Sequence, residues 1–521
     1  MTIFVTWYKI YLNSALKYFV RYKNRKGVTM FVHDLIHCGK EAAIAIVDHE
    51  RRFTYKEVAE RVRACRNRLY AAGVREGDRV GLFSRNSAEY IFAYLGICSL
   101  GAIVVPINFQ LSNREIAYII KDAGIKDLVT YEPLNLIDAL AALRCGIRLT
   151  QHDIKTLCRE KKGLADAPKP SDEFTDENPC VIIYTSGTTG NPKGAVLSHA
   201  NLIVNTKQME RVHTDSTHNV LCVLPMYHCF GWTCSVLNVL ACGAKIVILD
   251  SFTPKETIAT IREERVTDLY IVPSICSLLT KLANTEDMKT LRLVVSGGTT
   301  LPLKIQQDFV NKFGVDICEG YGLSETSPIL TLNPPEKPKV GSCGPIVDGV
   351  EWKIVDDNGE RVKTGETGEL VVKGPNIMLG YWNLPDVTLD AMRGGWFHTG
   401  DVARVDEDSY VYIVDRIKDM IISMGENIYP REVEELIYQF PGIEEAAVIG
   451  IEDKLRGQAG ACFYSLHAGA KINIRELKKF LQANLALYKI PREFHEMKKL
   501  PRTSTGKIAK RRILAEFNQD K

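Results

Sequence analysis

The sequence lacks several features that point to particular classes of protein. Its 521 residues carry a formal net charge of only +3, so it has no basic surplus of the kind that marks nucleic-acid-binding proteins. No secretory signal is evident, and the fourteen cysteines are scattered without a C-x-x-C pair or paired Cys/His spacing. We therefore expect neither a zinc site nor a disulfide scaffold, but a cytoplasmic enzyme with reduced thiols.

Acidic residues are absent from residues 1–30, which form a basic N-terminal segment. Polar residues recur there at every fourth position, at Lys9, Asn13, Lys17 and Arg21. A helix would carry them as one stripe beside an aromatic face, which suits a membrane surface but not a membrane span. The pattern predicts peripheral membrane contact through residues 1–27. Two alternatives stay open: a helix docked on the rest of the protein, and a non-native extension upstream of a start at Met30.

The body of the chain has the pattern of an α/β fold. Its length predicts two or more domains, and from Ile44 to about Lys418 short β-rich runs alternate with helix-like stretches, as in parallel architectures. Residues 161–178 are typical of a surface linker, and Ser198 is the expected N-cap of a helix at His199–Met209. The expected strands are Arg79–Phe83, Ala102–Val105, Cys180–Tyr184, Leu221–Leu224, Lys245–Leu249, Asp268–Val272 and Leu291–Val295.

The pattern changes after Asp415. Two helix-like and two strand-like runs follow, at Glu432–Phe440, Ala446–Ile451, Cys462–Leu466 and Ile474–Leu485. They predict a small α+β domain of ordinary size. We therefore expect the amphipathic segment at 1–30, a large multi-layer domain at 31–415, and a small, mobile C-terminal domain at 416–521.

The most informative segment is Tyr184–Gly194, which reads YTSGTTGNPKG. It follows a β-branched run and precedes a helix-like one. Glycines let a backbone approach a ligand closely, while hydroxyl groups and a lysine suit phosphate oxygens. The segment therefore predicts a phosphate-binding loop made of Thr185, Ser186, Gly187, Thr188, Thr189, Gly190 and Lys193. A P-loop NTPase is excluded by spacing, because Pro192 stands where its second glycine would be when counting begins at Gly187.

With this loop, the chain resembles the adenylate-forming superfamily of acyl- and aryl-CoA synthetases, peptide-synthetase adenylation domains and beetle luciferases. The resemblance runs from about Phe53 to Ile508. Six markers occur in the family's order: Tyr184–Gly194, Tyr227–Trp232, Tyr321–Pro328, Trp396–Asp401, Asp415–Glu434 and Pro501–Lys507. The resemblance implies an ATP-dependent acyl-CoA synthetase that forms acyl-AMP and then acyl-CoA.

The resemblance also implies residues that bind ATP. Tyr321 is expected to pack on adenine, and Asp401 to accept hydrogen bonds from the ribose hydroxyls with Arg416 nearby. Glu325 and Thr185 are expected at Mg²⁺, because a hard cation prefers oxygen ligands. The other implied ATP contacts are Gly297, Gly298, Gly322, Ser324 and Lys507.

Two half-reactions are implied, each with its own domain arrangement. Lys507 is expected to neutralise the charge that develops when the carboxylate attacks the α-phosphate. Lys418 matches the family's hinge, where rotation would withdraw Lys507 and present a CoA tunnel. The residues implied for that tunnel are Gly425, Glu426 and Asn427. His228 resembles the aromatic position beside the carboxylate and the thiol entrance, and completes a catalytic set with Lys507, Glu325 and Thr185.

The implied acyl pocket consists of Tyr227, His228, Phe230, Gly231 and Trp232. The segment around it is largely apolar, and no acidic residue lies between Tyr227 and Leu249 to bind an ammonium group. An α-amino acid is therefore not expected, and a medium- or long-chain fatty acid is favoured. An aryl- or other carboxylate-CoA ligase is the alternative, and a non-catalytic, membrane-associated acyl-binding protein is a third hypothesis. The implied small-molecule partners are ATP, CoA and the acid; a homodimer is left open.

Overall fold

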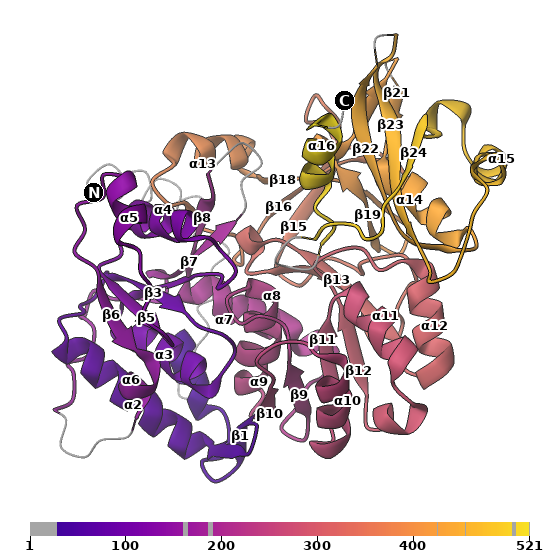
Figure 1. Cartoon of the computed structure of the whole chain (residues 1–521). Coiled ribbons are helices and arrows are strands. Elements are labelled where there is room, and N and C mark those ends of the chain that lie inside the picture. The colour runs from indigo at the N-terminus through magenta and orange to yellow at the C-terminus, as the bar shows by residue number, and fades with distance from the viewer. Residues whose placement is uncertain are drawn as a thin grey trace.

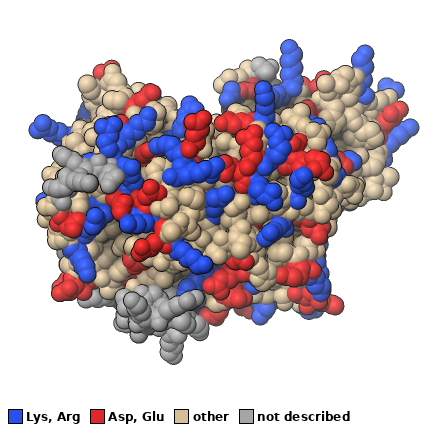
Figure 2. All heavy atoms as spheres, turned by 90° about the horizontal axis from the view of Figure 1, so that it is seen from below, with Lys and Arg blue, Asp and Glu red and all other residues tan. Residues whose placement is uncertain are grey.

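The computed structural model describes residues 29–159, 165–185, 191–424, 426–453, 455–502 and 507–519. Residues 1–28, which make up nearly all of the predicted amphipathic segment, lie outside the described residues. The predicted membrane contact of this segment therefore stays a prediction. Within the described part of the chain, no helix combines the length and apolar character needed to cross a membrane. Figure 2 shows basic side chains interspersed with acidic ones over the face seen from below, in keeping with the small net charge.

Two mixed sheets form the centre of the larger domain (Figure 1). The inner strands of the first sheet are parallel, and its two edge strands are antiparallel. Its order is β14 (Ile329–Leu332), β13 (Ile317–Gly322), β12 (Leu293–Ser296), β11 (Asp268–Ile271), β9 (Asn219–Cys222), β10 (Lys245–Ile248), β1 (Ile44–Asp48) and β2 (Arg51–Thr54). The second sheet has the order β17 (Gly380–Tyr381), β8 (Lys193–Ser198), β7 (Pro179–Thr185), β4 (Ile103–Pro106), β3 (Arg79–Phe83), β5 (Asp127–Thr130) and β6 (Thr150–Asp153).

Helices follow the strands of both sheets, as the alternating sequence pattern predicts. They are α2 (Tyr55–Ala71), α3 (Ala88–Ser99), α4 (Asn113–Ala123), α5 (Ile137–Ala142), α6 (Ile154–Cys158), α7 (His199–Gln208), α8 (Cys229–Trp232), α9 (Asn238–Ala241), α10 (Pro254–Glu263), α11 (Pro273–Leu282), α12 (Leu303–Phe313) and α13 (Pro385–Ala391). Ser198 is confirmed as the N-cap of α7, since its hydroxyl accepts from Asn201 N at 3.0 Å. One core packs the two sheets together with most of their helices, and a second core lies between the second sheet and α4.

Two smaller sheets follow in the chain. The first is antiparallel, with β15 (Glu351–Val355), β16 (Gly368–Lys373), β18 (Phe397–Val405) and β19 (Val411–Arg416). The C-terminal sheet contains β21 (Glu426–Ile428), β20 (Ile421–Ser423), β23 (Gly457–Leu466), β22 (Ile443–Asp453) and β24 (Glu493–Glu496), with α14 (Pro430–Gln439), α15 (Ile474–Asn484) and α16 (Lys510–Gln519) around it. This part has separate cores of its own and sits against the larger domain near β13 and α12 (Figure 1). The predicted α/β class, with a smaller C-terminal domain, is confirmed.

One local prediction is wrong. The glycine-rich loop does not lead directly into a helix, because β8 follows it and pairs antiparallel with β7. The loop therefore joins a hairpin, and α7 begins only at His199. The strand β13 begins at Ile317 and continues through Tyr321 to Gly322, where it pairs with β14.

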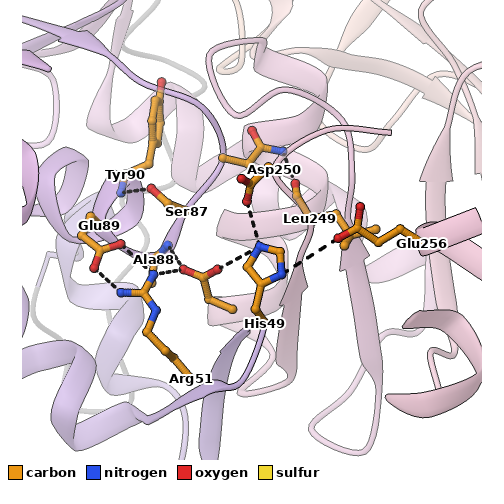
Figure 3. Close-up of polar contacts among 11 residues, drawn as sticks. His49, Arg51, Ser87, Ala88, Glu89, Tyr90, Leu249, Asp250 and Glu256 are labelled. Atoms are coloured by element: carbon orange, nitrogen blue, oxygen red, sulfur yellow. Dashed lines mark hydrogen bonds and ion pairs between the residues drawn. The ribbon is translucent and has the colours of Figure 1, made fainter. Parts of the chain in front are cut away.

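The end of β1 meets the start of α3, and Figure 3 shows Arg51 bound to Glu89 at this junction. Asp48 closes the strand, and its buried carboxylate accepts from Ala88 N at 3.0 Å, in the first turn of the helix. Arg51 of β2 binds both Asp48 and Glu89. Because α3 flanks the second sheet and β1 belongs to the first, this contact joins the two sheets and sets the position of the helix.

Candidate active site

Three of the predicted nucleotide residues meet at one carboxylate. Asp401 on β18 is only 1% exposed; its Oδ2 accepts from the Tyr321 hydroxyl at 2.5 Å, and its Oδ1 lies 3.1 Å from Nε of Arg416. Strand pairing makes this possible, because Asp401 and Arg416 are partners in the β18–β19 ladder. Burial raises the pKa of Asp401, and the charge of Arg416 opposes that rise. The result is a fixed acceptor beside an aromatic side chain.

Lys507 reaches the same place from the C-terminal domain. Burial and the nearby charge of Arg416 lower the pKa of its ammonium, while Asp401 raises it. Lys507 in turn contributes to the lowered pKa of His228. Lys507 therefore lies close enough to Asp401, Arg416 and His228 for their charges to interact across the two domains.

Glu325 and the lysine of the glycine-rich loop meet at a residue that the sequence did not single out, Tyr381. The hydroxyl of Tyr381 donates to Glu325 Oε1 at 2.9 Å, and the Lys193 ammonium lies 5.4 Å from the centre of the Tyr381 ring. The pairing of β17 with β8 positions the tyrosine. Thr185 closes the same hairpin, with its hydroxyl 3.4 Å from the Lys193 carbonyl. Only the aromatic pair Tyr381–Trp382, next to a glycine, could have suggested this contact.

His228 has a structural role that the sequence did not predict. It is the N-cap of α8, where Nδ1 accepts from Phe230 N at 3.3 Å. Burial, helped by Lys507, lowers its pKa to about 4, so the imidazole is neutral near pH 7. The next residue, Cys229, places its Sγ 3.4 Å from the Ser324 hydroxyl. The start of α8 is thereby joined to the Tyr321–Pro328 marker.

A narrow apolar cavity of about 10 Å³ lies beside these residues and includes Tyr227, Cys229 and Trp232 in its lining. The centre of the Trp232 ring lies 3.9 Å from the ring centre of Tyr94 and 5.8 Å from that of Tyr90. Both tyrosines belong to α3. The Phe230 ring lies close to Gly297, the residue just after β12. A Cβ built on that glycine would lie 3.1 Å from the ring. Gly298 adopts φ +80°, which favours glycine. Of the residues predicted for the acyl pocket, Tyr227 and Trp232 line this cavity, whereas His228, Phe230 and Gly231 are not part of its lining.

Some predicted site residues are not brought together. Ser186–Gly190 and Gly425 lie outside the described residues. Glu426 and Asn427 are exposed on β21, at the end of the C-terminal domain that points away from the larger domain (Figure 1). Lys418 is exposed in the turn after β19. This arrangement presents Lys507 rather than β21 to the nucleotide residues.

Gly322 should tolerate no side chain. A Cβ built there lies 1.7 Å from the Pro328 carbonyl oxygen, a backbone atom that cannot turn aside. We expect Gly322→Ala to displace Tyr321 and to lower the free energy of unfolding by roughly 1–3 kcal/mol, measured by urea denaturation, with weaker ATP binding. Gly146→Ala is the control, because a Cβ there meets nothing within 4 Å. Equal stability of the two variants would contradict the geometry.

Comparisons with known proteins identify the family of the chain. A model described as AMP-binding enzyme matches residues 37–382, and one described as AMP-binding enzyme C-terminal domain matches residues 432–507. A feruloyl-CoA synthase of an Amycolatopsis species is 36% identical over 89% of this chain and 94% of its own length. A long-chain-fatty-acid–CoA ligase of Bacillus subtilis is 31% identical over 91% of this chain and 92% of its own length.

Solved structures extend the likeness to the fold. O-succinylbenzoate coenzyme A synthetase (MenE) from Bacillus subtilis, in complex with ATP and magnesium ion, superposes with a TM-score of 0.82 at 28% identity. The match covers 93% of this chain and 99% of that one. The chain therefore belongs to the AMP-binding enzyme family, as an AMP-forming acid–thiol ligase of the acyl-CoA synthetase kind.

Proposed function

We propose that this ligase activates a medium- or long-chain fatty acid as an acyl-adenylate and transfers the acyl group to CoA. The observation that carries the proposal is the convergence of Lys507 with Asp401, Tyr321 and Arg416 beside an apolar cavity. This arrangement suits the first half-reaction. The carboxylate oxygen attacks the α-phosphorus of ATP, and the bond to the departing pyrophosphate breaks.

Residues of this chain bind and orient the reactants. Asp401 accepts hydrogen bonds from the ribose, Tyr321 packs on adenine, and Lys193 with the hydroxyls of the glycine-rich loop holds the phosphates. Lys507 stabilises the charge that develops at the α-phosphate, because a fixed cation costs no reorganisation when the charge appears. His228, being neutral, adds no competing charge beside the acid.

The donor set fits a magnesium ion. Glu325 is buried, and its Oε2 makes no hydrogen bond to the residues that the structure describes. A free carboxylate oxygen in a polar site is a suitable ligand for a hard cation, and Thr185 adds a hydroxyl nearby. When bound with ATP, the ion would neutralise phosphate charge. Glu325 and Thr185 are the residues proposed to hold it.

The second half-reaction needs a different arrangement of the C-terminal domain. In our proposal, rotation about Lys418 withdraws Lys507 and presents Gly425, Glu426 and Asn427 beside the pantetheine thiol. The sulfur attacks the acyl carbon, the thioester bond forms, and AMP leaves. The exposure of Glu426, Asn427 and Lys418 in the present arrangement is compatible with such a rotation.

A second candidate substrate is an aryl acid. The closely packed rings of Trp232 and Tyr94 favour it, because both line the narrow cavity and aromatic side chains suit a flat ligand. A long acyl chain would require Trp232 to turn aside. The relatives include ligases for both classes of acid, and the apolar lining suits both.

A panel of fatty and aryl acids tests the proposal, with pyrophosphate and acyl-CoA both measured. We expect chain-length-dependent turnover of fatty acids. Trp232→Ala should raise kcat/KM for long chains relative to short ones by about tenfold, because the removed ring leaves room for further methylene groups. Preferential turnover of aryl acids would favour the second candidate. If no acid yields acyl-CoA, the proposed function is wrong.

A further inference from the structure

A histidine and two carboxylates meet where two neighbouring strands of the first sheet end. β1 and β10 are parallel, with Asp48 paired to Ile248, so the residues that follow them emerge at the same edge of the sheet. His49 Nε2 lies 3.0 Å from Asp250 Oδ1 and 4.0 Å from Asp48 Oδ1. These three atoms all lie within 4.8 Å of one another. The proposed chemistry uses none of them.

The Asp48 carboxylate uses only one of its two oxygens in hydrogen bonds, although the residue is 2% exposed. Its Oδ2 accepts from Ala88 N at 3.0 Å and from the Arg51 guanidinium. Its Oδ1 accepts no hydrogen bond from the residues that the structure describes, and His49 is its nearest charged neighbour there. A buried carboxylate with an unsatisfied oxygen is costly unless a cation or a donor meets that oxygen. Arg51 also binds Glu89, so its charge is shared between two carboxylates.

A neutral His49 ring cannot donate to all the carboxylates around it. Asp250 and Asp48 both approach Nε2, and Glu256 Oε1 lies 4.0 Å from the other nitrogen, Nδ1 (Figure 3). A neutral imidazole carries a proton on one nitrogen only. With that proton on Nδ1, toward Glu256, the lone pair of Nε2 points between two anionic oxygens. A metal cation at this point would bind all three atoms, and Glu256 would orient the ring, as carboxylates on the far nitrogen of metal-binding histidines do.

We propose that Asp48, His49 and Asp250 form a binding site for a divalent transition-metal ion, of which Zn²⁺ is the best suited. Zinc accepts an imidazole together with carboxylates, whereas magnesium and calcium prefer oxygen ligands alone. Ligands about 2.0–2.2 Å from a tetrahedral zinc ion lie ~3.4 Å apart, and the observed separations of 3.0 and 4.0 Å bracket that value. His49 and Asp250 are half exposed, so water completes the coordination. Motif spacing could not predict this site, because these two residues stand 201 positions apart.

The site lies at the junction of the two sheets, so a bound ion should stabilise the larger domain. Asp48 contacts the first turn of α3, and Asp250 follows Leu249, whose carbonyl accepts from Asn86 Nδ2 at 3.1 Å. An ion that binds only the folded state raises the midpoint of thermal unfolding. Zn²⁺ at about 100 times its Kd should raise the midpoint of the full-length protein by about 2–4 °C. ATP is left out of this measurement, because its phosphates chelate the ion.

Calorimetric titration of the chelator-treated, full-length protein with Zn²⁺ tests the site directly. The parent should bind one ion more per chain than His49→Ala. In Asp250→Asn, which changes an exposed side chain, binding of that ion should weaken by more than about tenfold. Mg²⁺ should not displace the ion, because one of its ligands is an imidazole. The control is His213→Ala, which removes an exposed histidine that pairs with Glu336 at 2.6 Å and should bind Zn²⁺ as the parent does.

Equal stoichiometry in the parent and in His49→Ala would overturn the inference and would leave these residues as an ion-pair cluster only. Loss of the same ion in His213→Ala, or its displacement by Mg²⁺, would overturn it as well. None of these results bears on acid activation, since the site shares no residue with the proposed ATP and acyl contacts.

Discussion

Replacing Lys507 by alanine should lower acyl-adenylate formation by roughly 10²–10³-fold, the scale for loss of one preorganised charge stabiliser. The loss should be specific to the first half-reaction, because the proposed rotation of the C-terminal domain would withdraw Lys507 from Asp401 and Arg416. Thioester formation from supplied acyl-adenylate should stay within about threefold of the parent. Pyrophosphate exchange and single-turnover thioester assays measure the two rates.

A matched control for this variant is Lys498→Ala, which removes an exposed lysine from the same domain. It should leave both half-reactions unchanged. Should Lys507→Ala slow the two half-reactions equally, the lysine acts on folding or on domain position rather than on the α-phosphate. Thermal unfolding of both variants separates these explanations, since an exposed or half-buried lysine should change the midpoint little.

The second large effect is expected for Asp401→Asn. The amide keeps the shape of the side chain but replaces a charged acceptor, and a hydrogen bond to a charged group contributes about 1.5–3 kcal/mol. We therefore expect kcat/KM for ATP to fall by roughly 10²-fold, mostly through KM. The measurement is steady-state turnover with ATP as the varied substrate.

Asp408→Asn is the control for that variant, because Asp408 pairs with Lys339 at an exposed position in the turn between β18 and β19. Its KM for ATP should equal that of the parent. An unchanged KM for ATP in Asp401→Asn would contradict the proposed hydrogen bonds between Asp401 and the ribose. It would not affect the observed contacts of Asp401 with Tyr321 and Arg416.

What the sequence could predict was local in character. The N-cap at Ser198, the strand Arg79–Phe83 and the helix near Glu432–Phe440 follow from patterns within a few residues. Lys507 and Asp401 were identified through a resemblance that spans the chain, and the structure brings them together. Neither required knowledge of distant contacts.

Contacts between distant segments could not be predicted in this way. Tyr381 binds Glu325 because β17 pairs with β8. That pairing depends on the hairpin of β7 and β8, which the sequence pattern after Gly194 did not predict. Glu319 looks like any acid before a glycine, yet the fold leaves it only 3% exposed. Tertiary packing sets its environment, and the residues next to it in the sequence carry no information about that packing.

The contact of Asp48 with the first turn of α3 also affects how the larger domain loses its structure. The strand belongs to one sheet and the helix to the other, and a single apolar core continues across both. Neither sheet can open without exposing the apolar side chains of its neighbour. The two sheets should therefore melt as one cooperative unit, whereas the C-terminal domain, with cores of its own, can melt separately.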